Sequence, residues 1–91
     1  MYNITFSNKF KKDYKLCVKR GYDISKLQEV ITILQKTGKL PAKYKPHQLK
    51  GNYQGLWECH IKPDWLFVWL QNDNELTLLL TRTGTHSDLF K

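Results

Sequence analysis

The chain reads E-L-T-L-L-L-T-R-T-G-T-H-S-D-L-F from residue 75 to residue 90, and this stretch decides the fold. Leu76, Leu78 and Leu80 fall on one face at period two, which is the spacing of a strand buried on at least one side. The alternation stops after Thr81, so we predict that the strand ends there. A buried strand needs partners, and the preceding sequence supplies them.

Chemically versatile side chains follow this strand directly. A guanidinium (Arg82), an imidazole (His86) and an aromatic ring (Phe90) lie within nine residues, around a predicted glycine turn at 83–85. A rigid strand would therefore bring a planar cation and a titratable ring to the same end of a sheet.

Three earlier segments have the pattern of strands. Apolar residues alternate with polar ones over 1–6 and again over 57–62, while 65–70 is apolar on both faces. Lys62-Pro63-Asp64 predicts a tight turn between the second and third strands, and residues 71–74 predict the hairpin turn that leads into the last strand. The last three strands should therefore form an antiparallel meander.

Two amphipathic helices lie between the first strand and the meander. Ser7 predicts the N-cap of the first helix and Gly21 its end, while a capping box of Ser25 with Gln28 predicts the start of the second and Gly38 its end. Their apolar stripes are Phe10, Tyr14, Cys17 and Val18 in the first helix and Leu27, Val30, Ile31 and Leu34 in the second. The fold class is therefore α+β, a single domain over 1–91 in which strand, two-helix hairpin and three-stranded meander follow in order. The helices should pack on one sheet.

Positive charge is concentrated in the first half of the chain, whose net charge is +7 overall. Residues 1–50 hold twelve basic and three acidic residues (+9), whereas residues 51–91 hold three basic and five acidic ones (−2). A lysine-rich surface suits a polyanion held by phosphate contacts. Lysines that merely solvate the two helices are the alternative, which charge by itself does not exclude.

Several classes of protein and site are disfavoured. The longest apolar run, 65–70, is too short to span a membrane, and no signal-peptide core precedes the first charges, so we expect a cytoplasmic protein. Cys17 and Cys59 lack metal-ligand spacing and should be buried thiols. The three histidines are thirteen and twenty-six residues apart, without the close pair usual in zinc sites, so we expect neither metal nor other cofactor.

The function that remains for the histidines and Arg82 is acid–base chemistry on a phosphodiester. His47 lies in a predicted exposed loop at 39–48, His60 on the polar face of a strand, and His86 past the last strand. Cleavage of RNA without a metal ion needs a base, an acid and a fixed cation, and histidine and arginine supply all three. Trp65 and Phe90 would stack on bases, although core packing is an equal alternative for Trp65.

Three segments together resemble one known family. They are H-Q-L-K-G at 47–51, E-C-H-I-K-P-D-W at 58–65 and R-T-G-T-H-S-D-L-F at 82–90. In order and spacing, and within the predicted frame of strands and helices, they resemble the YafQ-type toxins of the RelE/ParE superfamily. Those toxins are the endoribonuclease halves of bacterial type II toxin–antitoxin pairs, with a RelE-like, microbial-RNase-like fold.

The resemblance implies an activity and partners. Such toxins cleave mRNA in the A site of the 70S ribosome by attack of the 2′-hydroxyl, without metal, and a small cognate antitoxin neutralises them, typically in a heterotetramer. By the same resemblance His86 is the general acid, Arg82 the transition-state cation and His60 with Asp64 the base. The residues that would bind substrate are His47, Lys62, Trp65 and Phe90. Two alternatives are a ParE-like toxin that binds gyrase and a catalytically silent RNA-binding module.

Overall fold

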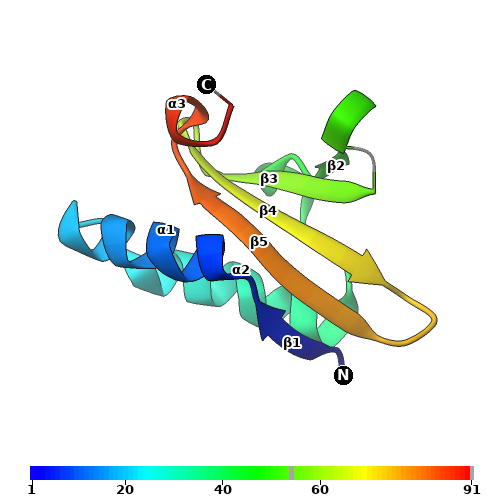
Figure 1. Ribbon diagram of the computed structural model, residues 1–91. Helices are drawn as coiled ribbons and strands as arrows, with labels where there is room; N and C mark the ends of the chain where they lie inside the picture. The colour runs from blue at the N-terminus through cyan, green and yellow to red at the C-terminus, as the bar shows by residue number, and fades with distance from the viewer. Residues whose placement is uncertain (54, 91) are drawn as a thin grey trace.

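Five strands in one sheet form the centre of the molecule in the computed structural model, which describes residues 1–53 and 55–90. In chain order the elements are β1 (Asn3–Phe6), α1 (Asn8–Lys19), α2 (Ile24–Thr37), the short 3-10 helix η1 (Ala42–Tyr44), β2 (His47–Gln48), the 3-10 helix η2 (Gly51–Tyr53), β3 (Leu56–Lys62), β4 (Trp65–Asn72), β5 (Thr77–Gly84) and α3 (His86–Leu89). The strand order is β1-β5-β4-β3-β2, with β1 parallel to β5 and the other pairs antiparallel. The α+β prediction and the meander are confirmed (Figure 1).

The two long helices begin and end at capping residues. Ser7 caps α1 as predicted, because its Oγ accepts the Phe10 N–H at 2.9 Å. The predicted capping box of α2 was wrong, since Asp23 is the N-cap and accepts the Ser25 N–H. Gly38 ends α2 in the left-handed region at φ +70°, which glycine adopts without steric cost.

Helices α1 and α2 cover one face of the sheet, and the core lies between the two helices and that face (Figure 1). Phe10 of α1 packs edge-on against Phe67 of β4, with ring centroids 6.0 Å apart. The fully buried helical residues are Phe10, Cys17, Leu27, Val30 and Leu34. Val18, predicted in the apolar stripe, is 52% exposed because it lies about 100° around the helix from Cys17. The remaining stripe positions pack on or against the core.

Both ends of the last strand differ from the prediction. Leu76 adopts φ +53° in the turn before β5 and is 44% exposed, so the buried leucines of this strand are Leu78 and Leu80. At the other end β5 continues past Thr81, because β4 goes on pairing with it up to Gly84. The segment predicted as an exposed loop at 39–48 also contains η1 and the two-residue edge strand β2.

A β-bulge in β5 decides which way its last residues point. Val68 of β4 pairs with Arg82, whereas the next residue, Trp69, pairs with Leu80, so Thr81 is an extra residue on β5. Paired residues point to the same face of a sheet. Without the bulge, Arg82 would share the helix-covered face with Leu80; with it, Arg82 points to the opposite face.

Candidate active site

We call the sheet face turned away from α1 and α2 the site face. Its register aligns His47, Glu58, Val68 and Arg82 in one row across four strands, and His60, Leu66 and Gly84 in the next. Strands lie about 4.8 Å apart, so the first row spans roughly 14 Å. Helix α3 and η2 lie on this same side of the sheet (Figure 1). Residues far apart in sequence thus share one surface.

His47 and His60 form one end of this surface, which we call the histidine side. Their ring centroids are 6.4 Å apart. His47 Nε2 lies 3.2 Å from Oε1 of the buried Glu58, and its Nδ1 lies 3.0 Å from the Lys45 carbonyl oxygen. His60 Nδ1 lies 3.3 Å from the Pro63 carbonyl oxygen. A carbonyl oxygen only accepts, so His60 donates from Nδ1, and its Nε2 keeps a lone pair when the ring is neutral.

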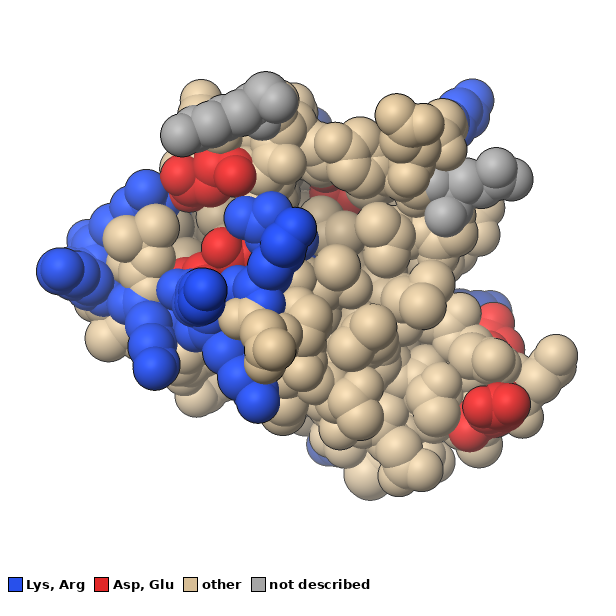
Figure 2. All heavy atoms as spheres, in the orientation of Figure 1, with Lys and Arg blue, Asp and Glu red and all other residues tan. Residues whose placement is uncertain are grey.

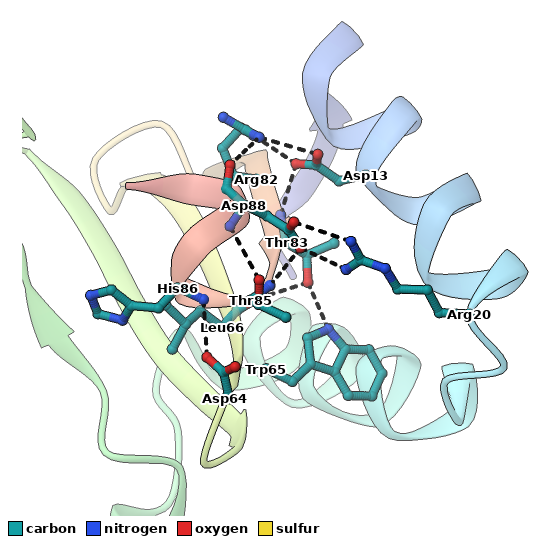
Figure 3. A network of polar contacts seen from close by, with 10 residues as sticks. All are labelled: Asp13, Arg20, Asp64, Trp65, Leu66, Arg82, Thr83, Thr85, His86 and Asp88. Atoms are coloured by element: carbon teal, nitrogen blue, oxygen red, sulfur yellow. Dashed lines mark hydrogen bonds and ion pairs between the residues drawn. The ribbon is translucent and has the colours of Figure 1, made fainter. Parts of the chain in front are cut away.

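Arg82 forms the other end, the arginine side, together with α3. Its Nε donates to Asp13 Oδ2 at 2.7 Å and its Nη2 to Asp13 Oδ1 at 3.2 Å, while the Thr83 N–H also donates to Asp13 Oδ2. The hydrogen bonds to Asp13 raise the pKa of Arg82 above its ordinary value. The guanidinium is therefore a permanent cation with a fixed direction (Figure 3).

Helix α3 carries His86 and is tied down at both ends of its single turn. Thr85 and Asp88 form a capping box, and Asp64 Oδ1 accepts the His86 N–H at 3.0 Å. Arg20 of α1 grips Asp88 with two hydrogen bonds of 2.6 and 3.1 Å, which hold the pKa of that carboxyl well below its usual range. The His86 ring points out of this network, away from α1 and α2 (Figure 3).

Aromatic rings line the surface beside His86. The Phe90 ring lies 5.2 Å from the His86 ring and 5.2 Å, edge to face, from the ring of Tyr53 on η2. Tyr53 is 44% exposed. Such rings offer faces on which unpaired bases stack. The sequence analysis named Phe90 but not Tyr53, because nothing in the short glycine-flanked segment around Tyr53 indicates that it lies beside Phe90.

Three further predicted site residues are Asp64, Trp65 and Lys62, and the surroundings of Asp64 differ from those expected. Asp64 contacts the backbone of His86, and no bond between it and His60 occurs within the described residues. Trp65 is 3% exposed and donates from Nε1 to Thr83 Oγ1 at 3.0 Å, which corresponds to the core-packing alternative. Lys62 is exposed at the end of β3, where it lines a hollow of about 450 Å³ together with Asp64, Trp65 and Tyr22.

Four charged residues that support the site were not singled out from the sequence. They are Asp13, Arg20, Glu58 and Asp88. A signal existed for two of them. Asp13 is the one acidic residue in the lysine-rich α1, and Glu58 lies two residues before His60 on the same strand face. Nothing local indicated that Arg20 and Asp88 pair, since 68 residues separate them.

The two thiols are buried in the core and are not part of this surface. Both cysteines are buried, and burial raises the pKa of Cys17 to about 11 and that of Cys59 to about 12. Within residues 1–53 and 55–90, no three His, Cys, Asp or Glu side chains are grouped as a metal ion would need.

In the same residues no helix is long and apolar enough to cross a membrane.

Comparisons with known proteins agree over nearly the whole chain. The family model described as "Bacterial toxin of type II toxin-antitoxin system, YafQ" matches residues 2–91. The mRNA interferase toxin YafQ of Escherichia coli (strain K12) is 40% identical over 89 residues, which cover 97% of this chain and 95% of that protein. The solved E. coli DinJ-YafQ toxin-antitoxin complex matches with a TM-score of 0.89 at 40% identity, covering 99% of this chain and 98% of that one. A metal-bound toxin from Helicobacter pylori matches with a TM-score of 0.90 at 46% identity, covering 99% and 100%.

Proposed function

The chain belongs to the YafQ family of bacterial type II toxins, and from this premise we propose that it is an endoribonuclease that cleaves mRNA in the A site of the ribosome. The observation that carries the proposal is the row across the site face. A bulge at Thr81 turns Arg82 toward the face that holds His47 and His60, and α3 places His86 just beyond the end of β5. A base, an acid and a fixed cation border one surface, as cleavage without a metal ion requires.

The proposed reaction moves one proton at each end of the scissile phosphate. His60 takes the proton of the 2′-hydroxyl, and the 2′-oxygen attacks phosphorus. The bond from phosphorus to the 5′-oxygen breaks, and His86 gives that oxygen its proton. Arg82 donates hydrogen bonds to the phosphoryl oxygens as their charge builds. The products are a 2′,3′-cyclic phosphate and a 5′-hydroxyl.

The supporting residues have distinct parts in this proposal. Asp64 holds the backbone of His86 and so fixes α3, a part different from the partnership with His60 that the sequence suggested. His47, paired with the buried Glu58, grips a flanking phosphate. Phe90 stacks on a base beside the cut, and Lys62 contacts the RNA backbone from the end of β3. Trp65 supports β5 from within the core.

The test is to replace His86, whose ring is not part of the core. His86→Ala should reduce cleavage by roughly 10² or more, as loss of a general acid does. Cleavage is followed by mapping mRNA 5′ ends after induction and by single-turnover cleavage on programmed ribosomes. Asp23→Asn is a suitable control, because asparagine caps a helix about as well as aspartate. Growth inhibition that survives both His86→Ala and Arg82→Ala would instead favour a gyrase-binding toxin.

The lysines of α1 are the proposed contact with ribosomal RNA. Lys and Arg side chains gather at the end of the molecule where α1 lies (Figure 2). Replacing two or three of Lys11, Lys12, Lys15 and Lys19 with Gln should weaken ribosome association and flatten its salt dependence while the fold is kept. Co-sedimentation over a salt series measures this. Binding that is unchanged at every salt concentration would contradict it and would leave the lysines as a solvated surface.

The proposed protein partner is a small cognate antitoxin. The relative from E. coli was solved as a toxin-antitoxin complex with DinJ. By analogy we propose that this toxin is bound by an antitoxin encoded beside it, in a heterotetramer. Co-expression with the neighbouring small acidic reading frame should restore growth, and the mass of the purified complex by light scattering tests the stoichiometry.

A further inference from the structure

Asp13 lies beside the edge of the sheet where β1 has ended. Strand β1 pairs with β5 only as far as Phe6 and Leu80, so the part of β5 from Thr81 to Gly84 has no paired strand on that side among the described residues. Two side chains that follow β1 replace the missing strand. Ser7 Oγ donates to the Thr81 carbonyl oxygen at 2.7 Å, and Asp13 Oδ2 accepts the Thr83 N–H at 3.1 Å. Asp13 is thereby fixed by the backbone of the strand that carries Arg82.

The same carboxylate grips the guanidinium of Arg82 at two points. The contacts from Nε and Nη2 measure 2.7 and 3.2 Å, the fork arrangement in which arginine and carboxylate planes match. The Asp13 side chain is 12% exposed and that of Arg82 26% exposed, so the pair is partly shielded from water. A third contact, from Nη2 to the Asp88 carbonyl oxygen, is long at 3.5 Å. Nη1 has no protein partner within the described part of the chain, and it is the nitrogen left for a substrate.

We propose that Asp13 is a positioning residue for the cleavage reaction, which orients Arg82 so that Nη1 meets the phosphoryl oxygens in the transition state. The inference rests on the proposed endoribonuclease function. An arginine on a strand end samples several rotamers, and ordering it during the reaction would cost entropy. Asp13 orders it beforehand, at the expense of part of its positive charge. Helix α1 would then have two roles. Its lysines would contact the ribosome, and Asp13, the one acidic residue in this helix, would orient the proposed catalytic cation.

A purely structural part for Asp13 is the competing explanation. The carboxylate also accepts the Thr83 N–H, and losing that bond would loosen the edge of β5 whatever Arg82 does. The two explanations differ in one respect. If Asp13 acts through Arg82, its removal has no further effect on cleavage once Arg82 is gone. If it only supports the strand, the two losses multiply.

A double-mutant cycle on programmed ribosomes tests this difference. Single-turnover cleavage is measured for the wild type, Asp13→Asn, Arg82→Ala and the double variant. We expect Asp13→Asn to lower kcat by roughly 10- to 100-fold with KM unchanged or lower, since the variant is more positive. The double variant should cleave no more slowly than Arg82→Ala. Losses that multiply, or a wild-type kcat for Asp13→Asn, would overturn the proposal.

Two further variants keep the result clear if Asp13→Asn is poorly folded. Asp13→Glu retains the charge and moves the carboxylate by one methylene, so we expect a reduced kcat at a melting temperature near that of the wild type. Asp23→Asn changes the net charge by the same amount at a helix cap of α2 and should cleave like the wild type. If the wild type itself does not cleave, the proposed function fails, which is a separate outcome from the cycle.

Discussion

The arginine side and the histidine side of the site face differ in how many short hydrogen bonds hold their residues in place. On the arginine side, the Asp13 carboxylate of α1 holds Arg82, while the Arg20 guanidinium of α1 and the Asp64 carboxylate of the β3–β4 turn hold α3, with contacts of 2.6 to 3.2 Å. On the histidine side, His47 stands on a two-residue edge strand, its side chain 48% exposed. Among the described residues, the His60 side chain has one hydrogen bond, of 3.3 Å, to the Pro63 carbonyl oxygen. The proposed cation and the helix that carries the proposed acid are therefore held by charged hydrogen bonds, whereas the proposed base and phosphate contact have weaker or more exposed partners.

The difference follows from the position of the strands. The end of β5 lies beyond β1, but it pairs with β4 as far as Gly84 and packs against α1, and both elements supply it with partners. Strand β2 is an edge strand, and among the described strands it pairs with β3 alone. Transition-state charge is stabilised best by groups that need no reorganisation. The proposed transition-state cation, Arg82, accordingly lies where neighbouring elements hold it in place.

The largest expected effect comes from removing the fixed cation. Arg82→Ala should lower the cleavage rate by roughly 10² or more, because the developing charge loses its donor. His47→Ala should cost about tenfold or less, because solvent and neighbouring lysines replace a phosphate grip in part. Single-turnover cleavage measures both on programmed ribosomes. Equal losses for the two variants would remove the distinction between the two sides.

A second expected effect concerns the attachment of α3. Asp88→Asn should lower the free energy of unfolding by about 1–2 kcal/mol at neutral pH, since the charged hydrogen bonds to Arg20 are lost. The folded pKa of Asp88 lies below its unfolded value, so its contribution is present above pH 4 and is lost as the pH falls further. Urea unfolding at pH 7 and below pH 4 should therefore give wild-type and variant curves that converge in acid. A constant difference across that range would show that the ion pair is not the cause.

A third, smaller effect tests the histidine side. Glu58→Gln keeps the shape of the buried side chain but removes the anion 3.2 Å from His47 Nε2. We expect a loss of a few-fold in cleavage, with RNA affinity affected more than kcat. Binding of a non-cleavable RNA with a 2′-deoxy nucleotide at the cut measures the affinity. A fall in kcat as large as that for Arg82→Ala would place His47 in the chemistry itself.

We expect that neither thiol takes part in cleavage, either on the arginine side or on the histidine side of the site face. Cys59 lies on the helix-covered face of β3, and both thiols are buried with raised pKa values of about 11 and 12. Alkylation of the folded protein at pH 7.5 should leave both unmodified and cleavage unchanged, whereas alkylation in guanidinium should add two groups by mass. Rapid labelling of the folded protein would show that the core opens more readily than its packing indicates.

Much of the fold was predictable from local patterns in the sequence. The strands at 57–62 and 65–70, the Ser7 cap and the Gly38 end of α2 all follow from periodicity and from capping residues, which act over a few positions. The pairing of β1 with β5 was not predictable, because it joins segments more than seventy residues apart. Trp65 was undecided for a similar reason, since its burial depends on Tyr22 and Thr83, which approach only in the folded chain.

The sequence by itself determined which chemical groups this protein has and roughly where along the chain they lie: three imidazoles away from the core, one guanidinium near the end of the last strand and a lysine-rich first helix. Only the tertiary structure decided how those groups face one another. Strict alternation would send Arg82 into the core beside Leu80, and one extra residue at Thr81 turns it to the site face. Strand register and long-range ion pairs depend on contacts between segments that are far apart in the sequence. They therefore cannot be predicted from any one local stretch.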